Sequence, residues 1–165
     1  MKVNTSRFGM LDLRDDDVIR FPVGVIGFPN EHSFVLLRRR EGSPVGWLQS
    51  TTTPWLALPV VSVDALQGAY SGASVEGSIE SVGLEFRRET CAVLVVLTAA
   101  PAVRPTVNLL APIVICSERR AGAQVLIEGS EYTTREPFVL REPVGPVAEP
   151  AREASTAASA SPHAF

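Results

Sequence analysis

The run Gln49-Ser50-Thr51-Thr52-Thr53 places a carboxamide beside four hydroxyl groups, between the only two tryptophans of the 165-residue chain, Trp47 and Trp55. A hydroxyl group acts as a nucleophile when an adjacent base takes up its proton. The sequence neighbours of this run include no histidine, carboxylate or lysine. Threonine is also common in β-strands, and Pro54 interrupts a central strand. The run therefore indicates a strand end, a polar connection and a new strand, with both tryptophans turned towards packing.

Other residues with catalytic or metal-binding chemistry are few. The two histidines are His32, in a Pro-Asn-Glu-His turn, and His163 near the C-terminus. A catalytic triad needs a histidine beside its nucleophile, and His32 is better interpreted as an exposed turn residue. No HExxH or CxxC spacing indicates zinc. The run Asp15-Asp16-Asp17 lacks the glycine and glutamate of an EF-hand loop. We therefore predict that the protein is not an enzyme and has neither a metal nor a cofactor.

Composition indicates one globular domain. Apolar residues make up 45% of the chain and charged residues 20%, which is an ordinary balance for a packed domain. The net charge of −3 gives no basic field that would attract nucleic acid. Neither the N-terminus nor the apolar run 91–103 has the length and continuity of a signal peptide or a membrane span. We expect a soluble, cytoplasmic monomer that does not bind nucleic acid or membranes.

The two cysteines, Cys91 and Cys116, each lie inside an apolar run. Single buried cysteines in a reducing compartment usually remain thiols. The sequence therefore predicts two buried thiols and no disulfide framework.

The apolar patterns before residue 142 are mostly those of β-strands. Short apolar or alternating runs, bounded by proline and glycine, predict strands within 17–28, 33–40, 55–61, 91–99, 112–118, 123–129 and 132–140. Pro59 suggests an edge position or a bulge. The last three runs are predicted to form a three-strand meander, with Gly129-Ser130 as the second turn.

Helix signals are weaker. Residues 74–84 place Val75, Ile79 and Val82 on one face, with Ser74 as a possible N-cap and Gly83 as a stop signal. A second, shorter turn is expected to start at Ser62. The predicted fold class is therefore mainly β, an antiparallel β-barrel-like domain with one or two short helices, over residues 1–141. Residues 142–165 are rich in alanine, proline and serine, and are predicted to be a disordered tail.

Four short motifs occur in a characteristic order along the chain. The first is Gly-x-x-Gly-Phe, with Gly24, Gly27 and Phe28, and the second is Trp-Leu-Gln-Ser, with Trp47, Leu48, Gln49 and Ser50. The third is Asn-Leu-x-Ala-Pro, with Asn108, Leu109, Ala111 and Pro112, and the last is a late Gln-Val that begins at Gln124. With this set, residues 2–140 resemble the FliW family of bacterial flagellar assembly factors.

The resemblance implies a small cytoplasmic, non-catalytic β-barrel-like protein. FliW proteins bind the translational regulator CsrA, which relieves the repression of flagellin mRNA, and they also bind flagellin. The resemblance thus implies two protein partners, CsrA and flagellin. Two alternatives of other classes are a barrel that binds a small molecule such as a flavin, and a purely structural interaction module.

The motif residues divide into expected contacts and expected structural positions. We expect partner-binding roles for Gln49, Ser50, Asn108 and Gln124, and leave a structural role equally open for Gln49 and Gln124. The remaining motif positions are expected to be structural: Gly24, Gly27, Phe28, Trp47, Leu48, Leu109 and Pro112. The chain departs from the family pattern at Thr51-Thr52-Thr53, where acidic residues are frequent, and at Cys116, where asparagine is usual.

Overall fold

The structure is a computed structural model that describes residues 1–38, 43–67, 72–83, 85, 87 and 89–140. The tail predicted for residues 142–165 lies outside the described residues, so that assignment stays a prediction. Among the described residues, no helix has the length and apolar character that a membrane span requires.

The secondary structure is mainly β, as predicted. The helical elements are α1 (Gly72–Glu80) and two 3-10 turns, η1 (Asp15–Asp17) and η2 (Val63–Ala65). The turn η2 begins after Ser62, whose Oγ accepts a hydrogen bond from the backbone N–H of Asp64, at the predicted place. The strands are β1 (Lys2–Thr5), β2 (Gly9–Asp12), β3 (Val18–Arg20), β4 (Ser33–Arg38), β5 (Val45–Ser50), β6 (Ala57–Ser62), β7 (Cys91–Thr98), β8 (Thr106–Val107), β9 (Ile113–Cys116), β10 (Ala121–Gln124) and β11 (Glu136–Pro137).

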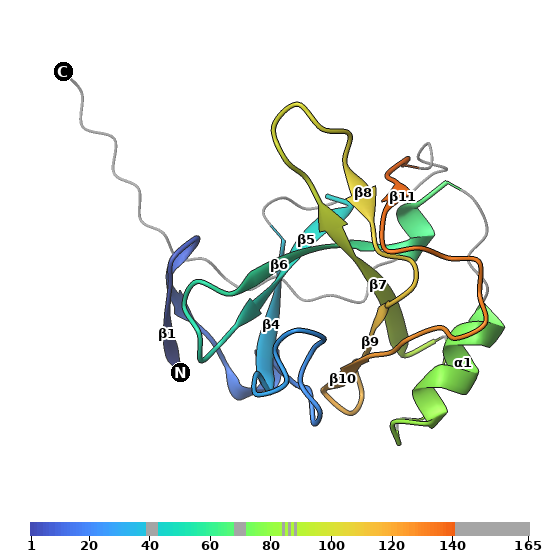
Figure 1. Ribbon diagram of the computed structural model, residues 1–165. Helices are drawn as coiled ribbons and strands as arrows, with labels where there is room; N and C mark the ends of the chain where they lie inside the picture. The colour runs from blue at the N-terminus through green and yellow to red at the C-terminus, as the bar shows by residue number, and fades with distance from the viewer. Residues whose placement is uncertain (39–42, 68–71, 84, 86, 88, 141–165) are drawn as a thin grey trace.

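Seven of these strands close into a barrel (Figure 1). The hydrogen-bonded order runs β7, β6, β5, β4, β3, β10, β9, and β9 pairs again with β7. We call this last pairing, Cys91–Leu94 against Ile113–Cys116, the closing pair. The expected antiparallel arrangement holds except between β10 and β3, which run parallel at the single register pair Ala121 and Arg20. A closed barrel leaves few unpaired strand edges.

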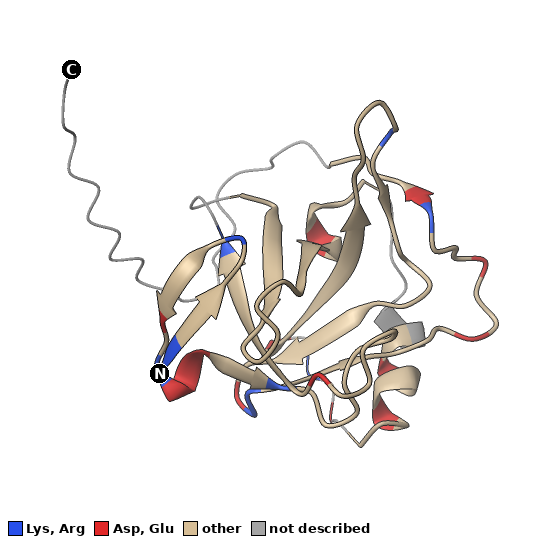
Figure 2. Cartoon of the chain, turned by 60° about the vertical axis from the view of Figure 1, so that its left-hand side comes forward, with Lys and Arg blue, Asp and Glu red and all other residues tan. Residues whose placement is uncertain are grey.

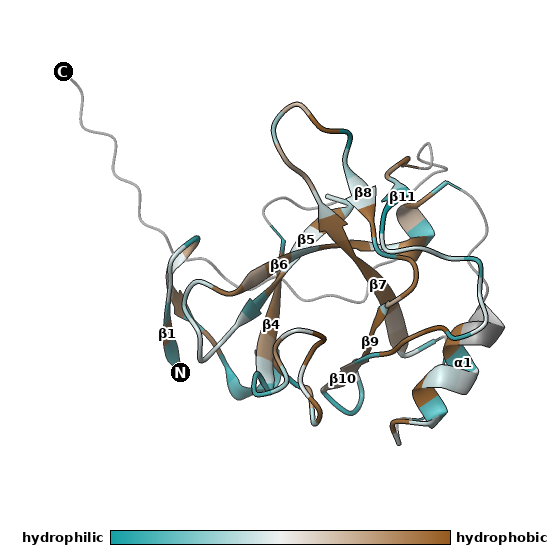
Figure 3. Ribbon diagram, in the orientation of Figure 1, coloured by the Kyte–Doolittle hydropathy of each residue, from teal (hydrophilic) through white to brown (hydrophobic). Residues whose placement is uncertain are grey.

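The barrel core explains the apolar runs of the sequence. Phe21 and Phe34 are fully buried and pack edge to face, with ring centroids 5.1 Å apart. Alternate residues of β4 face away from this core, and there Val35 and Leu37 pack under the β1–β2 hairpin. Because β4 is covered on both faces, its run is continuously apolar rather than alternating. Figure 3 shows the same apolar colouring along β4, β7 and β9.

Pro59 lies on a locally unpaired side of β6. It pairs with Trp47 of β5, whereas the ladder from β6 to β7 covers only Val60–Ser62. Proline has no backbone N–H to donate, so it fits where one neighbour is missing. The edge-like position predicted for Pro59 is therefore observed inside the barrel.

Helix α1 differs in its limits from the predicted helix. Val75 and Ile79 are fully buried against the strands β9 and β10, as their spacing indicated. The helix begins at Gly72, so Ser74 lies inside it and is not the N-cap. It ends at Glu80, and Val82 lies in the following turn with 39% of its surface exposed. Gly83, with φ +76°, lies in that turn, three residues after the end of the helix.

The predicted three-strand meander is wrong in its last strand. β9 and β10 form the expected hairpin, but β11 pairs with β8. After Gln124 the chain follows Pro112 and Leu110, whose carbonyl oxygens accept from Val125 and Ile127 N–H at 3.0 and 2.9 Å. Ala123, Val125 and Ile127 of the run 123–129 are thereby buried without a third strand returning beside it.

The prediction of two separate thiols is also wrong. Cys91 and Cys116 are joined by a disulfide. They are 25 residues apart in sequence and are register partners in the closing pair. Apolar runs identify the two strands individually, but they do not show which strands meet.

Charged residues are distributed over turns, strand ends and α1 (Figure 2). Blue and red segments alternate around the barrel, with the acidic η1 close to the N-terminus. Among the described residues, no group of three or more histidine, cysteine, aspartate or glutamate side chains is placed to hold a metal ion.

Candidate functional site: the motif surface

The Gly-x-x-Gly-Phe motif forms a tight turn after β3. The backbone N–H groups of Val25 and Phe28 each bond to the carbonyl oxygen of the other, at 3.3 and 2.8 Å. Gly24 and Gly27 have φ values of +71° and +88°, which L side chains rarely adopt. The tip of the turn therefore projects, and Ile26 has 59% of its surface exposed.

Gln124 joins this turn to the Asn-Leu-x-Ala-Pro motif. Its Oε1 accepts a hydrogen bond from the backbone N–H of Ile26 at 2.9 Å, and its Nε2 donates to the carbonyl oxygen of Ala111 at 3.0 Å. Asn108 Oδ1 in turn accepts from Ala111 N–H at 3.0 Å. Three motif segments, distant in sequence, thus meet around one half-buried glutamine.

The neighbouring motif residues lie inside the fold. Pro112 is buried, and Leu109 is half-buried beside the cluster that contains Val107. Leu48 is a fully buried core residue. Trp47 faces the other side of β5, where its ring packs against Phe8 at 6.0 Å between centroids and under the Arg7 guanidinium at 4.0 Å.

Gln49 is completely buried, with no exposed surface. Its Nε2 donates to the carbonyl oxygens of Ser50 at 2.9 Å and of Leu56 at 3.0 Å. The carbonyl oxygens of Thr53 and Pro54 lie at 3.5 and 3.3 Å from the same nitrogen. The amide therefore holds the 50–56 connection from within, and Gln49 does not meet solvent in this structure.

Three hydroxyl groups of the run at 50–53 bond to a carboxylate that is distant in sequence. Glu31, in the loop before β4, accepts hydrogen bonds from Ser50 Oγ at 2.6 Å, from Thr52 Oγ1 at 2.8 Å and from Thr53 Oγ1. Ser50 is fully buried and its Oγ also accepts from the backbone N–H of Thr53 at 2.8 Å. Three hydroxyl groups donating to one acceptor stabilise the loop and leave the carboxylate occupied.

This occupied carboxylate is a poor general base. Burial raises the pKa of Glu31, but the hydrogen bonds from Ser50, Thr53 and Thr52, with the nearby His32, outweigh burial, so the pKa lies below its usual range. His32 does not approach the hydroxyls as a relay, because its Nδ1 lies 2.9 Å from the carbonyl oxygen of Phe21. The arrangement supports a structural role for the hydroxyl run.

Replacing this carboxylate gives a pH-dependent test. The folded pKa of Glu31 is lowered, so its stabilising contribution is present above the unfolded value of about 4.3 and is lost as pH falls through the folded value. We expect Glu31→Gln to lower the free energy of unfolding by about 1–2 kcal/mol at neutral pH, and by progressively less below about pH 4. Urea denaturation at several pH values measures this difference. Glu128→Gln, at an exposed position, is the control, and parallel pH profiles for the wild type and Glu31→Gln would contradict the assignment.

Trp55 is not packed as predicted. It lies in the turn before β6 with 66% of its surface exposed, and Leu56, the last residue before the strand, takes the buried position instead. Its ring contacts Phe28 edge to face, with centroids 6.1 Å apart. The sequence shows that Trp55 follows Pro54, but it does not show that the strand begins only after Trp55.

Four of these residues are linked by contacts and form a small, partly apolar surface, which we call the motif surface: Ile26, Phe28, Trp55 and Gln124. Ile26, which is bonded to Gln124, and Trp55, which contacts the Phe28 ring, are exposed, while Phe28 and Gln124 are half-buried. Exposed apolar and aromatic side chains grouped in this way are typical of protein-binding sites. Gln49 and Ser50 lie behind this surface and hold the connection that ends at Trp55.

Comparisons with known proteins agree with the motifs. The sequence model of the FliW protein family matches residues 2–138. A flagellar assembly factor FliW from Geotalea uraniireducens is 40% identical over 138 residues, covering 84% of each chain. One from Heliobacterium modesticaldum is 37% identical over 136 residues, covering 82% of this chain and 88% of the relative.

A solved structure supports the same assignment. The crystal structure of a flagellar assembly factor FliW is similar to this fold with a TM-score of 0.66 and 30% sequence identity, covering 83% of this chain and 96% of the other. The family match spans most of the described barrel and includes all four motifs. The chain belongs to the FliW family.

Proposed function

We propose that this protein is a non-enzymatic, cytoplasmic flagellar assembly factor that binds CsrA and flagellin. Binding of CsrA would relieve its repression of flagellin mRNA, and secretion of bound flagellin would free this protein to bind CsrA. Family membership over residues 2–138 supports the role. The observation that carries the binding proposal is the motif surface. There Gln124 accepts a hydrogen bond from the backbone of exposed Ile26, and the Phe28 ring contacts exposed Trp55.

The geometry of the motif surface suits recognition of a protein. Ile26 is fixed through its backbone N–H by Gln124, and Trp55 rests on the Phe28 ring, so both apolar groups are held in place before a partner arrives. Aromatic side chains on a pre-ordered surface lose little conformational entropy on binding and often dominate the affinity. We assign the partner-binding role to this surface, with Gln124 and Asn108 positioning it from below.

Titration with purified CsrA and flagellin from the same organism tests the proposal. We expect Ile26→Ser and Trp55→Ala to weaken binding of at least one partner by about tenfold or more, with little change in melting temperature because both side chains are exposed. Val103→Ser is a matched control, since Val103 is equally exposed in the loop between β7 and β8, at the opposite end of the barrel (Figure 1).

Two results would contradict the proposal. If the wild type binds neither protein at tens of micromolar, the function is wrong. If it binds but Ile26→Ser, Trp55→Ala and Val103→Ser all retain wild-type affinity, the function stands and the motif surface is not the interface. Gln124→Ala tests the positioning role separately from direct contact. It removes the hydrogen bond to the Ile26 turn but leaves the Ile26 side chain, so it should reduce affinity less than Ile26→Ser does.

A further inference from the structure

The disulfide lies at one end of the strand pairing that closes the barrel. Cys91 is the first residue of β7 and Cys116 the last residue of β9, and the two are opposite each other in the ladder. Cys116 is 2% exposed and packs in the cluster that includes Val75 and Ile79 of α1. The bond therefore crosslinks the closing pair directly beside the contact between the barrel and α1.

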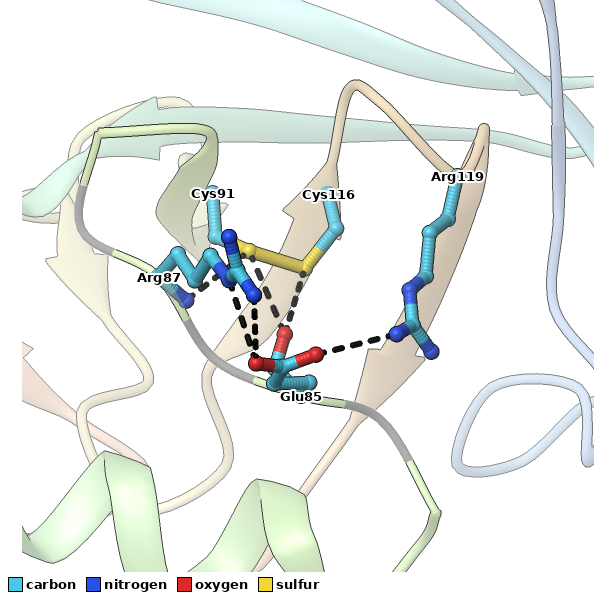
Figure 4. A network of polar contacts seen from close by, with 5 residues as sticks. All are labelled: Glu85, Arg87, Cys91, Cys116 and Arg119. Carbon is cyan, nitrogen blue, oxygen red and sulfur yellow. Dashed lines mark hydrogen bonds and ion pairs between the residues drawn. A yellow bond between two sulfur atoms is a disulfide. The ribbon is translucent and has the colours of Figure 1, made fainter.

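A polar hollow lies beside this bond. It is lined by Glu85, Arg87, Thr90, Cys116, Glu118 and Arg119. Figure 4 shows Glu85, Arg87 and Arg119 around the disulfide. The Glu85 carboxylate bridges two guanidinium groups, with Oε1 2.8 Å from Arg87 Nη2 and Oε2 3.0 Å from Arg119 Nη2. All three side chains are more than half exposed. Cys91 is half-buried as a residue, whereas Cys116 is 2% exposed.

The groups around the sulfur atoms suit both oxidation states. The backbone N–H of Arg87 donates to Cys91 Sγ at 3.5 Å, and the carbonyl oxygen of Glu85 lies 3.8 Å from both Sγ atoms. A disulfide has no proton to donate to that oxygen, whereas either thiol of the reduced pair does. The Arg87 and Arg119 guanidinium groups, each paired with the Glu85 carboxylate, bring partly neutralised positive charge to the hollow, and positive charge near a sulfur atom favours its thiolate. The site thus offers a backbone donor and partly neutralised cations to a thiolate, and an acceptor to a thiol.

From this arrangement we propose that Cys91 and Cys116 are a redox-active pair, a reversible disulfide that an external dithiol reduces and reforms. A thiolate of the dithiol attacks Cys91 Sγ, the S–S bond breaks, and Cys116 leaves as a thiolate that takes up a proton. The second thiol of the reagent then attacks the mixed disulfide and releases Cys91, which is also protonated. Two electrons and two protons pass to the protein, and the reagent becomes a disulfide.

Reduction removes a crosslink at the closing pair and leaves its backbone ladder. We expect the first residues of β7, the last residues of β9 and the adjoining surface of α1 to open more easily in the reduced protein. In the cytoplasmic location proposed above, disulfides are mostly transient and redox-sensing, which agrees with a pair that lies beside a polar hollow. The chemistry itself does not depend on which partner the motif surface binds.

The test equilibrates the intact wild-type chain in buffers of varied reduced to oxidised dithiothreitol. Free thiols are then trapped with iodoacetamide and counted by mass spectrometry. We expect one transition between no label and two labels per chain, while thermal unfolding remains cooperative in both states. Hydrogen exchange should accelerate on reduction by roughly tenfold or more at the start of β7 and the end of β9, with β4 and β5 unchanged.

Substitution of the surrounding cations provides a second measurement that does not alter the cysteines. Arg87→Gln and Arg119→Gln should each slow the alkylation of the reduced protein several-fold at neutral pH, because a thiolate loses a nearby positive charge. Arg104→Gln, in the exposed loop between β7 and β8, should leave the rate unchanged. Two labels per chain even in fully oxidised dithiothreitol would overturn the proposal. Reduction that occurs only together with global unfolding would also overturn it and make the bond a permanent structural crosslink.

Discussion

Gly24→Ala should lower the free energy of unfolding by about 3–4 kcal/mol, near the upper end for a single substitution. Gly24 is buried and its φ of +71° lies in the left-handed region. A Cβ added there would lie 2.6 Å from the carbonyl oxygens of both Phe28 and Pro29. These are backbone atoms, so the turn itself would have to move. At roughly 2–4 °C per kcal/mol, we expect the melting temperature to fall by about 6–16 °C.

Gly27→Ala is the matched control for this prediction. Gly27 lies in the same turn with φ +88°, but nothing lies within 4 Å of the added Cβ. Alanine there should incur only the cost of the left-handed backbone, about 1 kcal/mol. Differential scanning calorimetry of the two variants measures the comparison. Equal losses would show that backbone conformation alone, and not the close approach of two carbonyl groups, makes glycine necessary at position 24.

Displacement of this turn should also affect binding. Ile26 is attached to Gln124 only through the turn that Gly24 permits. The Gly24→Ala variant, at temperatures where it is folded, is therefore expected to bind partners more weakly than Gly27→Ala. The stability prediction does not require any particular partner.

Local patterns predicted the elements whose signals are local. The apolar run 91–99 and the run that starts at Ser33 were identified as covered strands, and both are buried on two faces in the barrel. Val75 and Ile79 were placed on the inner face of a short helix by their spacing. The β1–β2 hairpin was not predicted, because its four-residue strands, Lys-Val-Asn-Thr and Gly-Met-Leu-Asp, contain too few apolar residues to show a pattern in the sequence.

Features that depend on distant residues were not predictable in the same way. The Glu31 carboxylate is 19 residues from Ser50 and reaches it only after β4 and β5 pair. The bond between Cys91 and Cys116 depends on the closing pair, and no sequence pattern specified that β7 returns to β9. Gln124 was predictable only in part. Its position next to a strand suggested a partner-binding residue, but its two hydrogen-bond partners lie on two other loops.

Gln49→Ala should lower the free energy of unfolding by about 2–4 kcal/mol. The substitution leaves a cavity at a fully buried position and removes the donor that the carbonyl oxygens of Ser50 and Leu56 share. The cost is moderated because Gln49 Oε1 has no hydrogen-bond partner, so the wild-type amide is itself incompletely satisfied. Chemical denaturation against Gln67→Ala, an exposed glutamine, provides the control.

Comparison of Gln49→Ala with Gln124→Ala separates a structural role from a role in partner binding. Gln124 is half-buried, and the oxygen and the nitrogen of its side-chain amide each bond to a backbone group. Gln124→Ala should therefore lower the free energy of unfolding by about 1–2 kcal/mol, while partner affinity falls as the Ile26 turn loosens. Gln49→Ala should show the reverse balance: a large loss of stability and, in the fraction that remains folded, a smaller loss of affinity than Gln124→Ala. Because Gln49 reaches no solvent, a large loss of affinity with unchanged stability would mean that partner binding opens the 50–56 connection and draws this amide to the surface.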